Sequence, residues 1–363
     1  MTPSGIPNDR PGKNGGEGPG GRVPAADRWN ITICVCTFRR PEMLKKLLRA
    51  LKSQKTDGRF DFSVIVVDND RGQSGADVVR AAAADSPFPI EYLIEPERSI
   101  SAARNKAVHN AQGDWVAFID DDEFPDDHWL GRLLETLGRS GSEGVLGPIR
   151  PHFDNIPPSW LVKSRLLERK SYRTGETIEN PNDTRTGNAL VDRRLFDGDD
   201  GSFDLRYGKT GGGDVDFFNR MMLKGYRFVF CNEAIVYETV PPERQRRSYY
   251  VQRAFTRGMT TAMYVPLLSL GTLKSLAAII LYTAALPWAF LLGQHHFMEY
   301  LVKDCDHLGK VLKYVGIEIV KSRPYQAGVT APAPMTGLED GSGRPGAAES
   351  SGRMSRSRGG RDD

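Results

Sequence analysis

The chain has 363 residues, which is long enough for a large hydrophobic core and for more than one domain. Its net charge of +3, without a long basic run, gives no reason to expect a nucleic acid partner. The four cysteines resemble no zinc site in their spacing, so we expect reduced thiols. Because the N-terminus lacks the apolar core of a signal peptide, we expect the globular part in the cytoplasm.

Composition divides the chain into four parts. Residues 1–28 and 327–363 are rich in glycine, proline and polar residues and are predicted to be disordered tails. Between them, residues 29–240 carry the strand and helix patterns of a globular domain. Residues 241–326 are predicted to be helical, basic and membrane-associating.

Strands and helices alternate from Trp29 onward. Strands are predicted at 31–36, 62–67, 90–94 and 114–119, and helices lie between them, beginning at Pro41, at 76 and at 99. This alternation predicts an α/β fold with a doubly wound, mostly parallel sheet flanked by helices.

Polar side chains follow these strands at the points where they end. Thr37 and Arg39 follow the first strand, Asp68 and Asp70 the second, and a run of acids the fourth. The carboxyl ends of parallel strands meet in one crevice. The helix that carries Arg104, Asn105 and Lys106 would bring cationic side chains to this crevice. The arrangement suits a nucleoside diphosphate.

The fourth strand runs directly into Asp120-Asp121-Asp122-Glu123. A solvated acidic turn is the simplest interpretation of such a charge run. However, Asp120 and Asp122 also suit a hard divalent cation that keeps water ligands and bridges to substrate phosphates. We favour the metal site because the neighbouring strand ends are polar as well.

Seven segments together carry a family resemblance: CTFRRP, VVDND, ISAARNKAV, FIDDDE, IPPSWL, TGNALVDRRLF and KTGGGDVDFFNRMMLKGYRF. In this order and spacing they resemble glycosyltransferase family 2, which has the GT-A fold, and within it the bacterial exopolysaccharide glucosyltransferases of the succinoglycan type. The resemblance extends over about residues 31–260. No G-x-G-x-x-G follows the first strand and no Walker lysine loop occurs, which argues against dinucleotide and P-loop sites.

The resemblance implies a nucleotide-sugar site. Thr37 and Arg39 would contact the nucleotide, Asp68 would accept from the uracil N–H, and Arg104 and Asn105 would lie beside the nucleotide. The alternatives are a solvated Arg39, a turn-capping Asp68 and a helix-face ion pair for Arg104.

For the acidic run, the resemblance implies a D-x-D motif. Asp120 would lie near the ribose and the metal, and Asp122 would bind the metal, Mg²⁺ or Mn²⁺, directly. Asp121 is then expected to face away, although the triple aspartate leaves the register open by one residue.

The catalytic base implied by the resemblance is Asp214, with Asp216 as the second choice. The family usually has glutamate where this chain has Gly213, so the supporting carboxylate is unaccounted for. Asp214 as a helix cap is the structural alternative. One base opposite the leaving group implies transfer with inversion of configuration.

Trp160 and Asn188 are weaker candidates for contacts with the acceptor, together with His152, Thr186 and Gly187. An indole ring stacks readily on a sugar, yet a large aromatic residue is more often part of a core. QRRSYY lacks the tryptophan of the Q-x-x-R-W motif of processive synthases, which favours addition of one sugar per acceptor.

The C-terminal part holds a basic segment, 243–257, with five arginines, and an uncharged apolar stretch, 276–292. The apolar stretch is at the short limit for a spanning helix. Three alternatives remain for this stretch. It forms a helix that spans the membrane, part of an interfacial or re-entrant pair of helices, or a buried helix of a soluble protein. The first two place the protein at the cytoplasmic face of the inner membrane, beside a lipid-linked acceptor.

The leading hypothesis is therefore an inverting, metal-dependent glycosyltransferase. It would transfer one sugar from a UDP-hexose donor to a lipid-linked saccharide acceptor during the synthesis of an exopolysaccharide or cell-surface glycan. The alternatives are a nucleotidylyltransferase and a membrane-associated nucleotide-sugar-binding scaffold that has lost catalysis.

Overall fold

The computed structural model describes residues 28–198, 201–208, 211–262 and 266–317. The predicted tails lie outside these residues, apart from Arg28.

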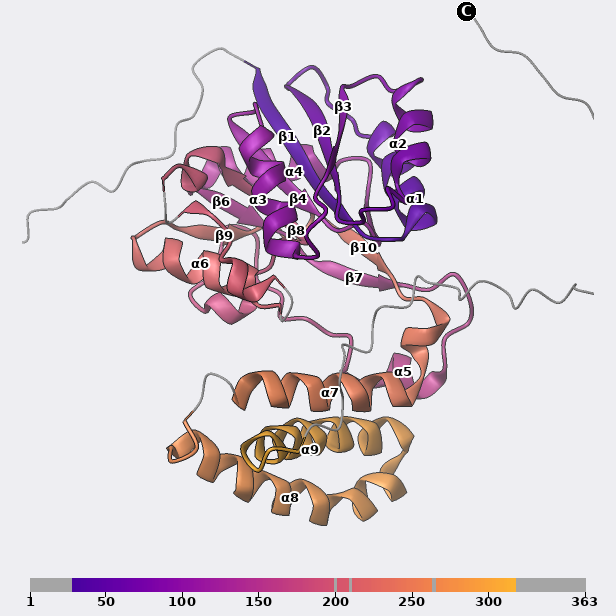
Figure 1. Cartoon of the computed structure of the whole chain (residues 1–363), viewed down its shortest axis with the longest axis vertical. Coiled ribbons are helices and arrows are strands. Elements are labelled where there is room, and N and C mark those ends of the chain that lie inside the picture. Colours follow the sequence, from indigo (N-terminus) through magenta and orange to yellow (C-terminus); the bar gives the residue numbers. More distant parts are fainter. Residues whose placement is uncertain (1–27, 199–200, 209–210, 263–265, 318–363) are drawn as a thin grey trace, which may run out of the picture. The chain divides into compact units, whose positions relative to one another are not determined.

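The first half of the fold alternates strictly between strands and helices (Figure 1). Its elements are β1 (Trp29–Thr37), α1 (Pro41–Lys52), β2 (Phe60–Asp68), α2 (Ala76–Ala83), β3 (Ile90–Ile94), α3 (Ile100–Asn110) and β4 (Trp115–Ile119). β1 lies between β2 and β4 and is parallel to both, and β3 is parallel to β2. The predicted doubly wound arrangement is confirmed, because near-continuous apolar strands need cover on both faces of the sheet.

The second half makes the sheet mixed. β8 (Asn188–Asp192) is antiparallel to β4, and the order of the seven strands is β3-β2-β1-β4-β8-β6-β9. A second sheet, which was not predicted, joins three short strands in the order β5-β10-β7. The remaining elements up to Thr239 are β5 (Glu123–Pro125), α4 (Trp129–Ser140), β6 (Gly144–Leu146), β7 (Ile149–His152), α5 (Ser159–Lys163), α6 (Gly213–Leu223), β9 (Phe228–Phe230) and β10 (Val236–Thr239), with 3₁₀ turns η1 (Pro181–Asp183), η2 (Arg193–Phe196) and η4 (Leu205–Tyr207).

Two apolar cores cover the two faces of the large sheet. Leucines of α1 and α4 and Val79 of α2 form one core with β1, β2 and β4. Small residues of α3 and the aromatic pair Phe217 and Phe218 of α6 form the other. Thr37 at the end of β1, Asp120 after β4 and Asp214 at the start of α6 lie outside both cores.

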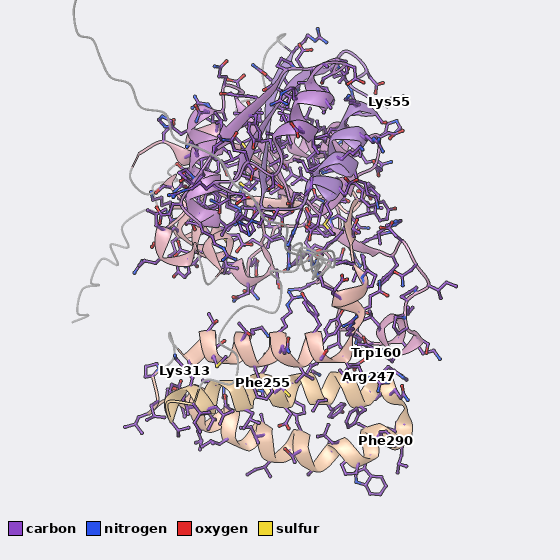
Figure 2. The ribbon with its side chains drawn as sticks, turned by 45° about the vertical axis from the view of Figure 1, so that its right-hand side comes forward. Lys55, Trp160, Arg247, Phe255, Phe290 and Lys313 are labelled. Atoms are coloured by element: carbon purple, nitrogen blue, oxygen red, sulfur yellow. The ribbon has the colours of Figure 1, made fainter. Side chains whose placement is uncertain are left out.

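After β10 the described chain is helical: η5 (Pro242–Gln245), α7 (Arg247–Ala262), α8 (Leu270–Leu292) and α9 (Gln294–Tyr314). α9 packs against both α7 and α8. A third apolar cluster joins α7 and α9 to α5, where the Arg247 guanidinium lies 5.6 Å from the Trp160 ring (Figure 2).

The apolar stretch 276–292 lies within α8, which begins six residues earlier, at Leu270. By length and composition alone, α8 is the one helix in the described chain that could cross a membrane. Only 11% of its most apolar stretch is buried. Within the described chain α8 is therefore not a buried core helix, since most of its apolar side chains face outward.

Candidate functional site

A cavity of about 1740 Å³ lies where the loop after β1, the end of β4 and the start of α6 meet. One side of α7 completes its wall. Ligand cavities are typically about 300–1,000 Å³, so this volume leaves room for two substrates at once.

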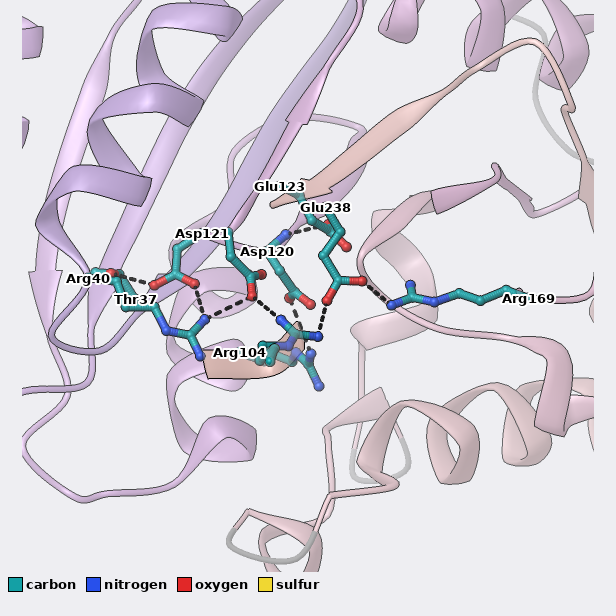
Figure 3. Close-up of polar contacts among 10 residues, drawn as sticks. Thr37, Arg40, Arg104, Asp120, Asp121, Glu123, Arg169 and Glu238 are labelled. Carbon is teal, nitrogen blue, oxygen red and sulfur yellow. Dashed lines mark hydrogen bonds and ion pairs between the residues drawn. The ribbon is translucent and has the colours of Figure 1, made fainter. Parts of the chain in front are cut away.

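The acidic run is held in place by groups from distant parts of the chain (Figure 3). The Thr37 hydroxyl donates to Asp121 Oδ2 at 2.8 Å, and Arg40 Nη1 lies 2.8 Å from Asp121 Oδ1. Asp122 Oδ2 lies 3.2 Å from Nη1 of both Arg40 and Arg244. Asp121, which we expected to face away, is thus the carboxylate tied most firmly to the end of β1.

Burial dominates the protonation of these acids. It raises the pKa of Asp122 to about 7, against the opposing charge of Arg40, and it also raises the pKa of Asp121 and Glu123. Neighbouring carboxylates add to each increase. An added cation would relieve this repulsion, because a metal ion reverses the local electrostatic balance.

Asp120 is the most accessible acid of the run. Its side chain is 46% exposed, and its Oδ1 lies 3.6 Å from Arg104 Nη2. In the described residues no group of three or more His, Cys, Asp or Glu side chains is arranged to hold a metal by itself. The Asp120 and Asp122 carboxylates would fit a metal ion that takes its other ligands from substrate phosphates and water.

Glu238 of β10 belongs to the same charged cluster. It pairs with Arg244 and with Arg169. Burial would raise its pKa, but the two guanidinium groups outweigh that effect and hold it below its usual value. We did not predict Arg40, Arg169 or Glu238 as site residues. Arg40 stands in CTFRRP and Arg244 in the basic segment, whereas nothing local marks the other two.

The loop after β1 is conformationally special at Arg39, whose φ of 55° lies in the left-handed region. Non-glycine residues adopt this region at a cost and often near functional sites. The half-exposed Arg39 side chain lines the cavity, and its Nε lies 3.2 Å from Asp70 Oδ1.

Asp68 does not line the cavity in this structure. Its fully buried carboxylate accepts from the backbone N–H groups of Asp70 (3.0 Å) and Gly75 (2.7 Å) and from the Tyr92 hydroxyl (2.8 Å). This is the geometry of the turn-capping alternative. The neighbouring Asn69 lines the cavity instead.

Asn105 is also engaged within the fold. Its side-chain amide donates to the Phe203 carbonyl at 2.8 Å, and its Oδ1 accepts from the Phe203 N–H at 2.7 Å. Both ends of the amide therefore anchor the loop that leads to α6. Of the Arg-Asn pair, only Arg104 lines the cavity.

Asp214 lies in the first turn of α6 and lines the cavity. Gly211 and Gly212, with φ of 82° and 91°, form the turn before it, and Gly212 is the N-cap, so Asp214 is not the helix cap. Asp214 Oδ1 accepts from the Val215 N–H at 3.0 Å, and no ion pair joins it to a cation in the described part of the chain. Asp216 also lines the cavity, but its carboxylate lies 2.9 Å from Arg220 Nε.

Trp160 and Asn188, two of the residues predicted to contact the acceptor, lie away from the cavity. Trp160 is 9% exposed and packs edge-on against Tyr250, in the cluster of α5, α7 and α9. Asn188 is fully buried; its Oδ1 accepts from Trp129 Nε1 and its amide donates to the carbonyls of Pro148 and Ala234. Because these partners occupy both side chains, the structure brings neither to the site.

Comparisons with known proteins agree with this geometry. A family model described as glycosyl transferase family 2 matches residues 32–198. The succinoglycan biosynthesis protein ExoM of Rhizobium meliloti is 38% identical over 237 residues, which cover 64% of this chain and 74% of that protein. The chain belongs to glycosyltransferase family 2.

More distant relatives are similar to this chain as well. A GalNAc(5)-diNAcBac-PP-undecaprenol beta-1,3-glucosyltransferase of Campylobacter jejuni is 22% identical over 62% of this chain and 63% of its own length. Among solved structures, the mannosyltransferase PcManGT of Pyrobaculum calidifontis, in complex with GDP-Man and Mn²⁺, matches with a TM-score of 0.53 and 20% identity over 83% of this chain and 92% of that one. The latter likeness bears on the fold alone and supports the GT-A arrangement.

Membership of family 2 glycosyltransferases makes the protein a sugar-transferring enzyme and removes the nucleotidylyltransferase alternative.

Proposed function

We propose that this family 2 glycosyltransferase moves a single hexose from a UDP-sugar to a saccharide acceptor, with inversion, during synthesis of an exopolysaccharide or cell-surface glycan. The observation that carries the proposal is one large cavity with two different carboxylate groups. Asp120 to Asp122 lie among arginines, whereas Asp214 has no cation paired with it in the described chain. The 38% identity to a succinoglycan biosynthesis protein supports the product class.

The proposed chemistry is a single displacement. Asp214 accepts the proton of an acceptor hydroxyl while the hydroxyl oxygen bonds to the anomeric carbon. The bond from that carbon to the diphosphate oxygen breaks, and UDP leaves with the bonding electrons. A base needs a free lone pair, which the ion pair of Asp216 with Arg220 makes less available there.

The donor diphosphate is assigned to the opposite wall. Asp120 and Asp122 would hold a Mg²⁺ or Mn²⁺ ion, which when bound offsets the negative charge of the diphosphate. Arg98 and Arg253 line the cavity, are exposed, and have no carboxylate paired with them in the described chain. We propose that they meet phosphate oxygens of the donor. Manganese in the complex of the related mannosyltransferase fold supports the choice of metal.

The acceptor is proposed to be lipid-linked, at the cytoplasmic face of the inner membrane. The printed name of the Campylobacter jejuni relative describes a polyprenyl-linked saccharide. In this chain the apolar α8 belongs to the helical layer that also contains α7, a wall of the cavity.

Substitution of the proposed base tests the mechanism. Asp214→Asn should lower transfer by about 10²- to 10⁴-fold, as removal of a general base does, and leave UDP-sugar binding intact. Asp216→Asn is the matched control, because it lies on the same turn but is paired with Arg220, and it should lose far less. Turnover on a panel of UDP-sugars and donor affinity by calorimetry would be measured. Normal turnover of Asp214→Asn would disprove the assignment.

Metal removal tests the other wall. Chelation should abolish UDP release, and added Mn²⁺ or Mg²⁺ should restore it, because two carboxylates are proposed to bind the ion. The Asp122→Asn variant should need a higher metal concentration than the wild type and should weaken Mn²⁺ binding measured directly by electron paramagnetic resonance. Unchanged Mn²⁺ binding in this variant would reject Asp122 as a ligand.

The alternative of a nucleotide-sugar-binding scaffold without catalysis arises because this chain has Gly213 where the family usually has glutamate. A Cβ added there would lie 3.2 Å from Ser101 Oγ and 3.3 Å from Tyr207 Cβ, so the family's usual glutamate would be crowded at this position. Donor binding by the wild type without release or transfer of any sugar would favour the scaffold.

A further inference from the structure

The outward face of α8 is apolar along the whole helix. Large side chains with at least 46% exposure recur from Leu270 to Leu292, among them Ile280 (73%), Trp288 (71%) and Leu291 (76%). The helix contains one charged residue, Lys274. An exposed apolar surface of this length on a folded protein marks a contact with lipid or with another protein.

The inward face of α8 is narrow and is held by polar contacts to α9. Lys310 Nζ donates to the Gly271 carbonyl (3.0 Å) and to Ser275 Oγ (3.3 Å). Thr283 donates to Asp304 Oδ2 at 3.1 Å, near the middle of both helices. Lys310 and Asp304 are 6% and 8% exposed, so these charged residues are built into the seam.

This seam limits how α8 can meet a bilayer. Gly293 alone separates α8 from α9, and the two helices remain packed together along their length. If α8 crossed the hydrocarbon, α9 would accompany it with Asp304, Lys310 and the further charges Glu299, Lys303, Asp306 and Lys313. Charged side chains are strongly disfavoured at the bilayer centre. Breaking the seam instead would leave Lys310 and Asp304 without their partners on α8.

Composition favours an anionic lipid surface over a protein partner. α8 is long and apolar enough to cross a membrane, and its one charged residue is the exposed, basic Lys274. Basic segments beside an apolar helix are attracted to anionic headgroups. The aromatic Trp288 on the outward face suits the boundary between headgroups and acyl chains.

We infer that α8 lies along the surface of an anionic bilayer, with its outward face in the acyl region and α9 on the aqueous side, and that it does not cross. α7, on the other side of α9, would then hold the cavity beside the lipid surface. Only the idea that a lipid-linked acceptor reaches the cavity from this surface rests on the proposed function.

Depth-dependent quenching of tryptophan tests the orientation in the full-length protein. Trp288 is the most exposed of the five tryptophans, so Trp288→Phe provides a background and Leu281→Trp places a probe at the midpoint of α8. Phosphatidylglycerol-containing vesicles would carry lipids brominated either near the headgroup or near the chain end. Leu223→Trp in the same background is the matched control, because Leu223 is an exposed leucine of α6, in the catalytic part.

The inference expects the Leu281→Trp probe to be quenched most by bromine near the headgroup, and the Leu223→Trp control not to be quenched. Strongest quenching by bromine at the chain end would show a crossing helix and overturn it. Absence of vesicle binding, or binding without quenching of the probe, would also overturn it. UDP-sugar turnover of the same variants reports on the proposed function separately, since α8 contributes no residue to the cavity lining.

Discussion

At the scale of single residues, the role of a polar side chain follows from whether its partners lie inside the fold. Asn188 and Asp214 are both polar residues in segments that resemble the family. Asn188 forms three hydrogen bonds within the core, whereas Asp214 accepts one hydrogen bond from the Val215 N–H and forms no ion pair in the described chain. These contacts favour a structural role for Asn188 and support our proposal of Asp214 as the base.

Substitution of Asn188 makes this distinction measurable. Asn188→Ala should lower the free energy of unfolding by roughly 3 kcal/mol, because three buried hydrogen bonds of about 1 kcal/mol each are lost and their partners are left unsatisfied. Urea denaturation of the full chain would measure the change. Asn182→Ala, at an exposed amide in the cavity lining, is the control and should alter the stability by less than about 0.5 kcal/mol.

If Asn188→Ala kept a stability close to that of the wild type and raised the KM for the acceptor, Asn188 would be an acceptor-binding residue and the structural role would be wrong.

At the scale of elements, the helical layer depends on close approach of α7 and α9. Gly258 of α7 and Gly309 of α9 lie at this contact. A Cβ added at Gly258 would lie 2.0 Å from the Asp306 carbonyl oxygen, and one at Gly309 would lie 2.6 Å from the Phe255 carbonyl oxygen. Backbone atoms cannot rotate away, so glycine is needed for the two helices to pack this closely.

Gly258→Ala should therefore destabilise the protein by about 1–3 kcal/mol, the usual effect of overpacking, although alanine favours helix formation. Gly138→Ala is the matched control, because Gly138 is an exposed helical glycine of α4 with open space around it. It should stabilise by about 0.5–1 kcal/mol. Thermal unfolding of both variants would show opposite shifts, and a stabilised Gly258→Ala would contradict the α7–α9 packing.

At the scale of the whole molecule, the fold brings together charged groups that are far apart in the sequence. Arg40 follows β1, Asp122 follows β4, and Arg244 precedes α7, yet a chain of ion pairs links the three. Arg244 also pairs with Glu238 of the small sheet. The acids after β4 are thus connected through ion pairs to the segment that precedes α7.

The sequence by itself determined the alternation of strands and helices, the acids after β4 and the candidate base Asp214. These features are local: apolar runs specify buried strands, and the motifs occupy consecutive residues. Boundaries followed within a few residues, as with β3 at Ile90–Ile94.

Only the tertiary structure decided which polar groups remain free. Asp68 and Asn105 match the family motif, yet donors and acceptors from the turn after β2, from Tyr92 and from Phe203 occupy them. Glu238 carries no local signal and enters the site through the pairing of β10 with β5. Likewise, the apolar stretch of α8 predicts a membrane contact, whereas our proposal for its orientation rests on the buried charges of α9. The physical reason is that burial and pairing depend on contacts between segments remote in sequence.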